Sequence, residues 1–436
     1  MKKIFISLAS AVLLFSACSS DENQNTDPQA TTKGSVVFTL GLDDATEGVK
    51  AATTDKIIPI TSWNNIKEIQ LFFYKKGAGT VDGEVAYSYI LDQAKIQSAV
   101  TSSSGTKEFS WNDIPVGTYD LAVVANISTP TTKMGMSLDG GTTATDFTKD
   151  NVKGKKVNTD MRMSLRPSSF PIGHTFEAGD KAYAGPNEIF SAYAKDVNIV
   201  EGVVTPLGSV LALKRDVAMM RVRVNRKAIV NTVNFLDAQS FVAIHRMPKW
   251  FGFRTQIPAF GGGIFGGSEE NNIMIVSQGT TTYLTTNPSA TDYKNTSTTP
   301  STDIRIIDRG DDFTMWRDII ILPNKENNAN GSAPAAGDAA NNMKYFIVLT
   351  AKAPAGYEAL DENNDLRALP APAHVYWKGT INGAFTPNKI REVNLTITSP
   401  GTTVIPPGPG QEGGLEIEIG APEDWNSAIE VENKEL

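Results

Sequence analysis

The chain of 436 residues has room for two or three domains, and it combines 40% hydrophobic and 20% charged residues with 36 glycines and 23 prolines. This composition favours a turn-rich β protein over a helical one and excludes disorder throughout. The formal net charge is -8 and there is no long basic run. Nucleic acid is therefore not an expected partner, because phosphate binding needs clustered lysines and arginines.

The first 18 residues have the pattern of an export signal. Two lysines at positions 2 and 3 precede an apolar stretch at 4–15, which is too short to span a bilayer as a helix. The stretch ends in the run FSAC, which resembles the bacterial lipobox, although Phe15 stands where Leu, Val or Ile is usual. A lipobox implies that residues 1–17 are a signal peptide and that Cys18 carries lipid, such as palmitate. The alternative is an ordinary secretion signal with an incidental cysteine.

Cys18 is the only cysteine, so no intramolecular disulfide exists and its thiol is free to be the lipid site. The run SSDEN that starts at residue 19 resembles the acidic tag of surface-exported lipoproteins of the Bacteroidetes. Residues 21–32 then form a polar tether. The expected location is the outer membrane and the cell surface.

Residues 34–42 predict a half-buried strand with large apolar side chains alternating along one face. These side chains are Val36, Phe38, Leu40 and Leu42. Burying them contributes about 1.5 to 3 kcal/mol each, a sum comparable to the stability of about 5 to 15 kcal/mol of a whole domain.

A polar loop follows this strand and ends in Lys50. A protease specific for basic residues could cut there and leave Ala51 as the new first residue. We interpret residues 18–50 as a lipidated tether with a removable strand. The alternative is that Lys50 is only a solvated loop lysine.

A first body domain is expected at 51–209. Core strands are predicted at 66–74 and within 111–126, and another alternating strand at 161–165. A loop at 202–208 precedes a new strand region at 211–224, so we place the domain boundary near residue 209. A second domain at 210–400 then has short buried strands at 273–276, 319–322 and 345–350, long loops such as 324–342, and a last strand at 388–398.

Residues 401–436 read as a linker and a final strand. Prolines and glycines at 406–410 cannot join a sheet interior, and the segment 415–419 then alternates acidic residues with three apolar ones, Leu415, Ile417 and Ile419. Residues 402–414 could span about 40 Å at about 3.1 Å per residue, which would carry this strand to a neighbour. Strand addition of this kind gains affinity from main-chain hydrogen bonds. The alternative is an ordinary edge strand of the second domain.

No catalytic or metal-binding pattern stands out, so we expect neither enzyme activity nor a metal nor a cofactor. His174, His245 and His374 lack the HxH or HExxH spacing and a cysteine partner. The glycine-rich run at 261–267 lacks the Lys-Ser/Thr of a phosphate loop, and no GxSxG is present. The six tryptophans fit a core better than a sugar-stacking surface.

These segments together resemble the fimbrillin family, the major stalk subunits of the type V pili of Bacteroidales. The likeness rests on the lipobox, on the first strand with its basic position, and on the runs IKEIQLFFY, PVGTYDLAVVAN, LKRDVAMMRVRV, NKIREVNLTITSPGT and LEIEIGAPEDW. It implies an all-β fold of two transthyretin-like β-sandwich domains in tandem, with a C-terminal donor strand. In the best-known members the cut follows an arginine, whereas here it would follow Lys50.

The resemblance further implies a structural, non-enzymatic pilin in a fimbrium that serves adhesion. A trypsin-like or Lys/Arg-specific surface protease would remove the first strand, and the C-terminal strand of one subunit would fill the vacated groove of the next. Partners would be other copies of the chain, related pilin subunits, the outer membrane and a ligand on host or bacterial surfaces. The main rival is a carbohydrate-binding outer-membrane surface lipoprotein that stays monomeric, and a glycosidase is a more distant one.

Overall fold

The fold is built almost entirely from strands. The computed structural model describes residues 32–42, 63–75, 83–252 with gaps at 104, 129–132, 141–143, 146–149, 158, 227–229, 231, 236 and 238, then 265–266, 271–277, 304–309, 312–323, 345–383, 385–405, 414–420 and 423–424. Within these ranges the only helices are a 3-10 turn, Trp63–Asn65, and α1, Gln93–Ser98. The all-β prediction is confirmed. No helix among the described residues is long and apolar enough to cross a membrane.

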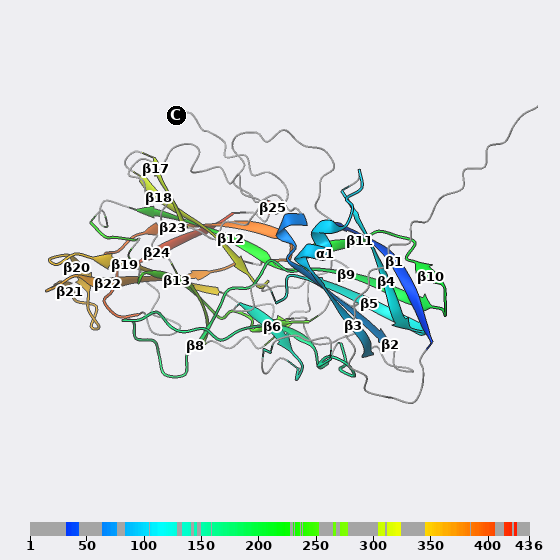
Figure 1. The fold of residues 1–436 in the computed structure, drawn as a ribbon. Helices are drawn as coiled ribbons and strands as arrows, with labels where there is room; N and C mark the ends of the chain where they lie inside the picture. Colours follow the sequence, from blue (N-terminus) through cyan, green and yellow to red (C-terminus); the bar gives the residue numbers. More distant parts are fainter. Residues whose placement is uncertain are drawn as a thin grey trace, which may run out of the picture.

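One eight-stranded sheet forms the right-hand end of the molecule in Figure 1. Its main path runs β10 (Val204–Pro206), β1 (Lys33–Leu42), β11 (Leu211–Arg215), β9 (Phe190–Ile199), β5 (Gly117–Ala125), β2 (Glu68–Lys75) and β3 (Glu84–Asp92). The eighth strand, β4 (Lys107–Pro115), pairs with β1. A single apolar core joins side chains from β1, β2, β4, β5, β9 and β11, so the sheet curls around its own interior.

The remaining strands form three further sheets and a hairpin. The six-stranded sheet contains β17 (Ile304–Arg309), β18 (Asp312–Ile321), β12 (Ala218–Arg226), β23 (Lys389–Ile397) and β24 (Leu415–Ile419), with β25 (Glu423–Asp424) paired to β23. The five-stranded sheet runs β22 (Ala373–Ile381), β19 (Tyr345–Ala353), β13 (Phe241–His245), β16 (Asn272–Ser277) and β8 (Lys181–Tyr183). The four-stranded sheet runs β15 (Phe265–Gly266), β14 (Trp250–Phe251), β7 (Arg162–Leu165) and β6 (Met134–Ser137). The hairpin consists of β20 (Glu358–Leu360) and β21 (Leu366–Ala368).

Strand β2 is buried on both faces, as the apolar run LFFY at 71–74 indicates. Leu71 and Phe73 pack into the core of the eight-stranded sheet. Phe72 and Tyr74, on the opposite face, join the large second core, which also holds side chains of β7, β12, β19 and β23. The two ends of the molecule are therefore packed against each other through β2 and its neighbour β5.

The expected boundary near residue 209 does not coincide with the change of sheet. β11 pairs with β1 and β9 in the eight-stranded sheet, and the chain enters the six-stranded sheet only at Ala218. Three strands from the expected first domain, β6, β7 and β8, instead belong to the four- and five-stranded sheets. Alternation in the sequence identifies strand faces but not the sheet that each strand joins, so the sheets do not follow the expected division of the chain.

A buried ion pair fixes the end of β11 where the chain changes sheets. The Nε and Nη2 atoms of Arg215 both lie 2.9 Å from Glu188 Oε1, and Nη1 donates to Asn388 Oδ1 at 2.7 Å. The Arg215 side chain is fully buried and its guanidinium lies 5.0 Å from the centre of the Phe190 ring. This one side chain thus joins β9, β11 and the turn before β23.

We expect Glu188→Gln to lower the free energy of unfolding by about 3 to 5 kcal/mol, because the buried charge of Arg215 would lose its counter-charge. Asp113→Asn is the matched control, since the pair that Asp113 forms with Lys33 is exposed (74% and 54%) and such pairs contribute about 1 kcal/mol or less. Urea denaturation of both variants measures the difference. Equal losses would contradict the role assigned to the buried pair.

Candidate functional site

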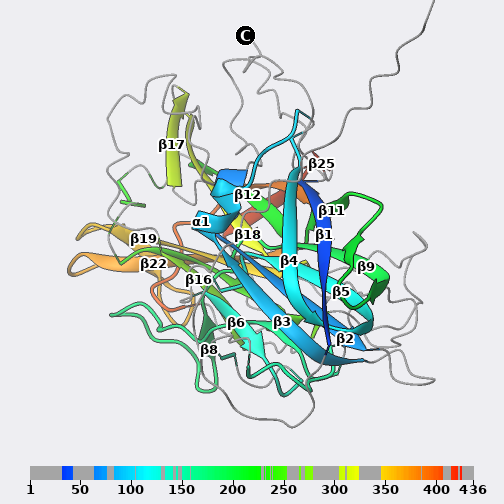
Figure 2. The same ribbon diagram turned by 45° about the vertical axis from the view of Figure 1, so that its right-hand side comes forward.

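Strand β1 occupies a deep slot between other strands of its sheet. On one side it pairs antiparallel with β4, Phe38 facing Phe109, and on the other it runs parallel to β10 and β11. The predicted alternation is present, and the exposed fractions of the four apolar side chains lie between 0 and 6%. Figure 2 shows β1 beside β4 along most of its length. Taking β1 away would open an apolar groove flanked by unpaired backbone on both sides.

Aromatic packing strengthens this attachment. The rings of Phe38 and Phe109 are stacked with centres 5.9 Å apart, and Trp63 lies 6.4 Å from Phe109 in turn. At the start of the strand, Ser35 N donates to Val203 O at 3.2 Å, and Leu207 N donates to Val37 O at 2.8 Å. Stacked aromatic pairs contribute about 0.5 to 1.5 kcal/mol beyond their buried area, so Phe38 is the strongest single anchor of β1.

Strand β24 is attached much less firmly. It forms the edge of the six-stranded sheet by pairing antiparallel with β23, so that Ile417 faces Leu395. Its three apolar side chains, Leu415, Ile417 and Ile419, are only half-buried against the large core, and its two glutamates are exposed. Strand β24 is five residues long, against ten for β1. In this monomer the candidate donor strand therefore lies on its own body as an edge strand.

The contact between β24 and β22 depends on a glycine. A Cβ atom built on Gly379 would lie 2.4 Å from Ile417 Cδ1, which is closer than any ordinary contact. A side chain at this position must push Ile417 outward, and the absence of one lets β24 lie close to β22.

We expect Gly379→Val to loosen β24 while leaving the rest of the sheet in place, because overpacking costs about 1 to 3 kcal/mol at the point of contact. Hydrogen exchange of the amides at 415–419 should accelerate about 5- to 100-fold. Thr380→Val is the control, since adjacent strand residues point to opposite faces. Unchanged exchange in Gly379→Val would contradict this contact.

The segment 399–403, which leads to β24, is hydrogen-bonded to the five-stranded sheet and to the β20–β21 hairpin. Thr402 exchanges two backbone hydrogen bonds with Tyr376, at 2.9 and 3.0 Å, and Trp377 Nε1 donates to Ser399 O at 3.0 Å. Gly401 adopts a φ of 85° against the Trp377 ring, where a Cβ would lie 2.8 Å from the indole. The linker that remains, 404–413, is three residues shorter than the expected 402–414 and would span about 30 Å at about 3.1 Å per residue.

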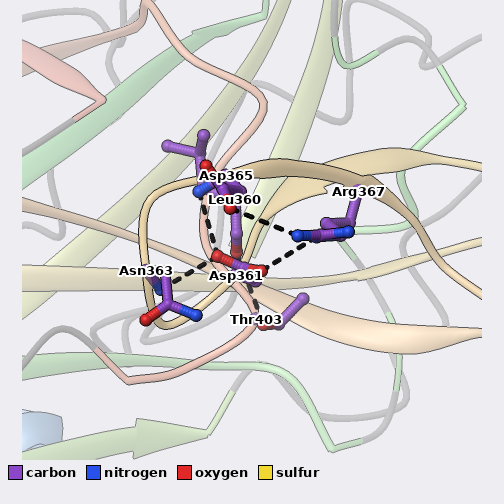
Figure 3. A network of polar contacts seen from close by, with 6 residues as sticks. All are labelled: Leu360, Asp361, Asn363, Asp365, Arg367 and Thr403. Carbon is purple, nitrogen blue, oxygen red and sulfur yellow. Dashed lines mark hydrogen bonds and ion pairs between the residues drawn. The ribbon is translucent and has the colours of Figure 1, made fainter.

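Figure 3 shows the last of these contacts, in which Thr403 lies against the turn of the β20–β21 hairpin. Thr403 N donates to Leu360 O at 2.9 Å, next to Asp361. The pKa of Asp361 is lowered by hydrogen bonds from the backbone of Asp365 and Asn363 and by the Arg367 guanidinium. The Asp361 carboxylate is therefore engaged in holding the turn that receives the linker.

Several predicted positions lie outside the described residues: the signal region, Cys18, Lys50, Ala51 and the glycine-rich run except 265–266. The structure does bring two of the three histidines together, which the sequence did not indicate. The ring centres of His174 and His374 are 4.6 Å apart, and His374 Nε2 lies 2.9 Å from Asp237 Oδ1. Among the described residues, no group of three or more His, Cys, Asp or Glu side chains could hold a metal ion.

Comparison with known proteins identifies a family. The family model described as "Fimbrillin-A associated anchor proteins Mfa1 and Mfa2" matches residues 53–327. Among solved structures, the chain is similar to the tip fimbrial protein Mfa3 from Porphyromonas gingivalis with C-terminal truncation, at 10% identity and a TM-score of 0.34, covering 90% of this chain and 100% of that one. It is also similar to a fimbrilin from Porphyromonas gingivalis W83, at 14% identity and a TM-score of 0.34, covering 89% and 96%. No curated protein matches the sequence.

Proposed function

The chain belongs to the family of fimbrillin-A associated anchor proteins Mfa1 and Mfa2, and from this premise we propose that it is a stalk pilin assembled by donor-strand exchange. It is exported as a surface lipoprotein through Cys18 and cut after Lys50, so that β1 leaves with the tether. The C-terminal strand of a second copy, or of a related subunit, then enters the vacated groove. The polymer is a fimbrium on the outer membrane and serves adhesion.

The observation that carries this proposal is the difference in burial between β1 and β24. Four fully buried side chains of β1 contribute roughly 6 to 12 kcal/mol. The three half-buried side chains of β24 contribute about half as much per residue where they lie. Moving β24 from its shallow edge into an empty β1 groove would bury its apolar face fully and pair both of its edges. Exchange is therefore favourable once β1 has gone.

The linker before β24 also supports transfer of this strand to a second subunit. Because residues 399–403 are fastened to Trp377, Tyr376 and Leu360, β24 can leave without unravelling the strands before it. Residues 404–413 then span about 30 Å at most, so the accepting subunit must lie close to the end of the donor.

Cleavage and assembly can be tested together on the purified precursor. After treatment with a Lys-specific protease, the wild-type chain should lose the segment before Ala51 and form high-molecular-weight polymers on size-exclusion chromatography. The double variant Lys50→Gln/Lys56→Gln, which has no lysine between β1 and Lys67, should keep β1 and stay monomeric, whereas Lys56→Gln alone should behave as wild type. Polymers from the double variant, or wild-type chains that stay monomeric after the cut, would refute the proposal.

A further inference from the structure

A cavity of about 540 Å³ opens beside the five-stranded sheet, outside the strands that we assign to assembly. Its walls come from the loop 173–180, the end of β13, Asn271 just before β16, strands β19 and β22, and residues 403–405. Small-molecule sites in proteins typically enclose about 300 to 1,000 Å³. The cavity has the size of a ligand site, and segments far apart in the sequence converge on it.

Two cations are held against one aromatic ring in this cavity. The Arg246 guanidinium lies 4.7 Å from the centre of the Phe346 ring, and Lys378 Nζ lies 5.3 Å from it. Arg246 has a φ of 65°, a left-handed conformation that a non-glycine residue adopts at a cost in backbone strain. Lys378 is almost completely buried. Strained backbone and a buried charge at one wall are typical of a site shaped for a ligand.

A neutral histidine stands next to these cations. Burial, and secondarily the charge of Lys378, lower the pKa of His245 to about 3. Its Nε2 atom is buried and has no hydrogen-bond partner among the described residues. A ligand hydroxyl can satisfy this nitrogen whichever tautomer is present.

Acceptors balance the cations on the loop side. Glu177 and Asp180 both line the cavity, and burial raises the pKa of Asp180. Tyr376 adds a phenol oxygen: since His174 Nε2 lies 2.9 Å from the Gln239 carbonyl, its Nδ1 accepts from Tyr376 at 2.6 Å. The lone pairs of the phenol oxygen remain available. The cavity thus offers two positive groups, two carboxyl groups, and neutral donors and acceptors between them.

We propose that this cavity binds a neutral saccharide of one or two rings. Sugar hydroxyls donate to Asp180 and Glu177 and accept from Arg246 and Asn271, so that the ligand has polar contacts on both walls. An anionic ligand would meet the carboxyl groups, a cationic one would meet Arg246 and Lys378, and an apolar one would leave the buried Nε2 atom of His245 without a hydrogen bond. The site contains no residue of β1 or β24, and it would give the subunit a binding activity of its own.

The test is binding of neutral mono- and disaccharides, with N-acetylglucosamine, galactose and lactose among them, first on a glycan array and then by calorimetry at up to about 10 mM sugar. We expect saturable binding of at least one of them. Arg246→Asn and Asp180→Asn should each weaken it about tenfold or more. Asparagine tolerates the left-handed backbone at 246, and at 180 it keeps the oxygen that accepts from Glu177 N. Glu201→Gln, on an exposed turn outside the cavity, is the control and should bind as wild type.

Absence of binding by all the neutral sugars, binding of glucuronate alone, or affinities unchanged in both cavity variants would overturn the proposal. If a cavity variant fails to fold, ¹⁵N NMR of the unaltered chain decides. The His245 side-chain resonances should shift when the sugar saturates the protein, and unshifted resonances would also overturn it.

Discussion

Phe38→Ala is expected to lower the free energy of unfolding of the full chain by about 3 to 5 kcal/mol, the usual range for truncating a buried phenylalanine. Phe38 is 1% exposed and stacks on Phe109 at the centre of the β1–β4 pairing. Neighbouring strands fix the walls of the slot, so the vacated space cannot collapse. Urea denaturation, followed by circular dichroism, measures the loss.

Val37→Ala is the matched control, because it lies on the same strand but its side chain is only half-buried. We expect it to cost about 1 kcal/mol or less. After the cut at Lys50 and loss of β1, both variants should have the same stability as the cleaved wild type. A loss of less than about 1 kcal/mol in Phe38→Ala would contradict the large contribution of β1 to the stability of the uncut chain.

Ile417→Asp is expected to abolish assembly while leaving the monomer folded. At the edge of its own sheet the aspartate can turn toward water, because Ile417 is only half-buried there. In a β1 groove the same carboxylate would be fully desolvated, at a cost of several kcal/mol. We therefore expect polymer formation to fall by at least about a hundredfold, which corresponds to about 3 kcal/mol.

The exposed face of the same strand supplies the control. Glu418→Ala alters a side chain that points to solvent in the monomer, and it should polymerise as wild type after cleavage. Electron microscopy of the cleaved proteins, with circular dichroism of the monomers, gives both readouts. Normal fibres from Ile417→Asp would refute donor-strand exchange through this segment.

The sequence predicted the strands that carry the proposal, but it did not predict their partners. Alternation over 36–42 and 415–419 indicated one apolar face each, and the structure has β1 and β24 at these positions. Hydrophobic periodicity reports which side chains are buried. It carries no information on pairing, so the parallel contacts of β1 with β10 and β11 were not foreseen.

The same limit explains why the sequence did not predict the cavity beside the five-stranded sheet. His174 and Tyr376 are 202 residues apart in the chain, and their contact depends on the sheet order of β13, β19 and β22. No local spacing of histidines, acids or cations marks such a site. Arg246 and Lys378 likewise resemble ordinary surface cations in the sequence, and only the fold brings both of them to Phe346.

The removal of β1 is the central claim, and N-terminal sequencing with intact mass of the protein sheared from cell surfaces tests it most directly. The account predicts a start at Ala51 in high-molecular-weight material. A lipidated start at Cys18, in a chain that keeps β1 and stays monomeric, would contradict it and would favour an anchor or a sugar-binding lipoprotein instead.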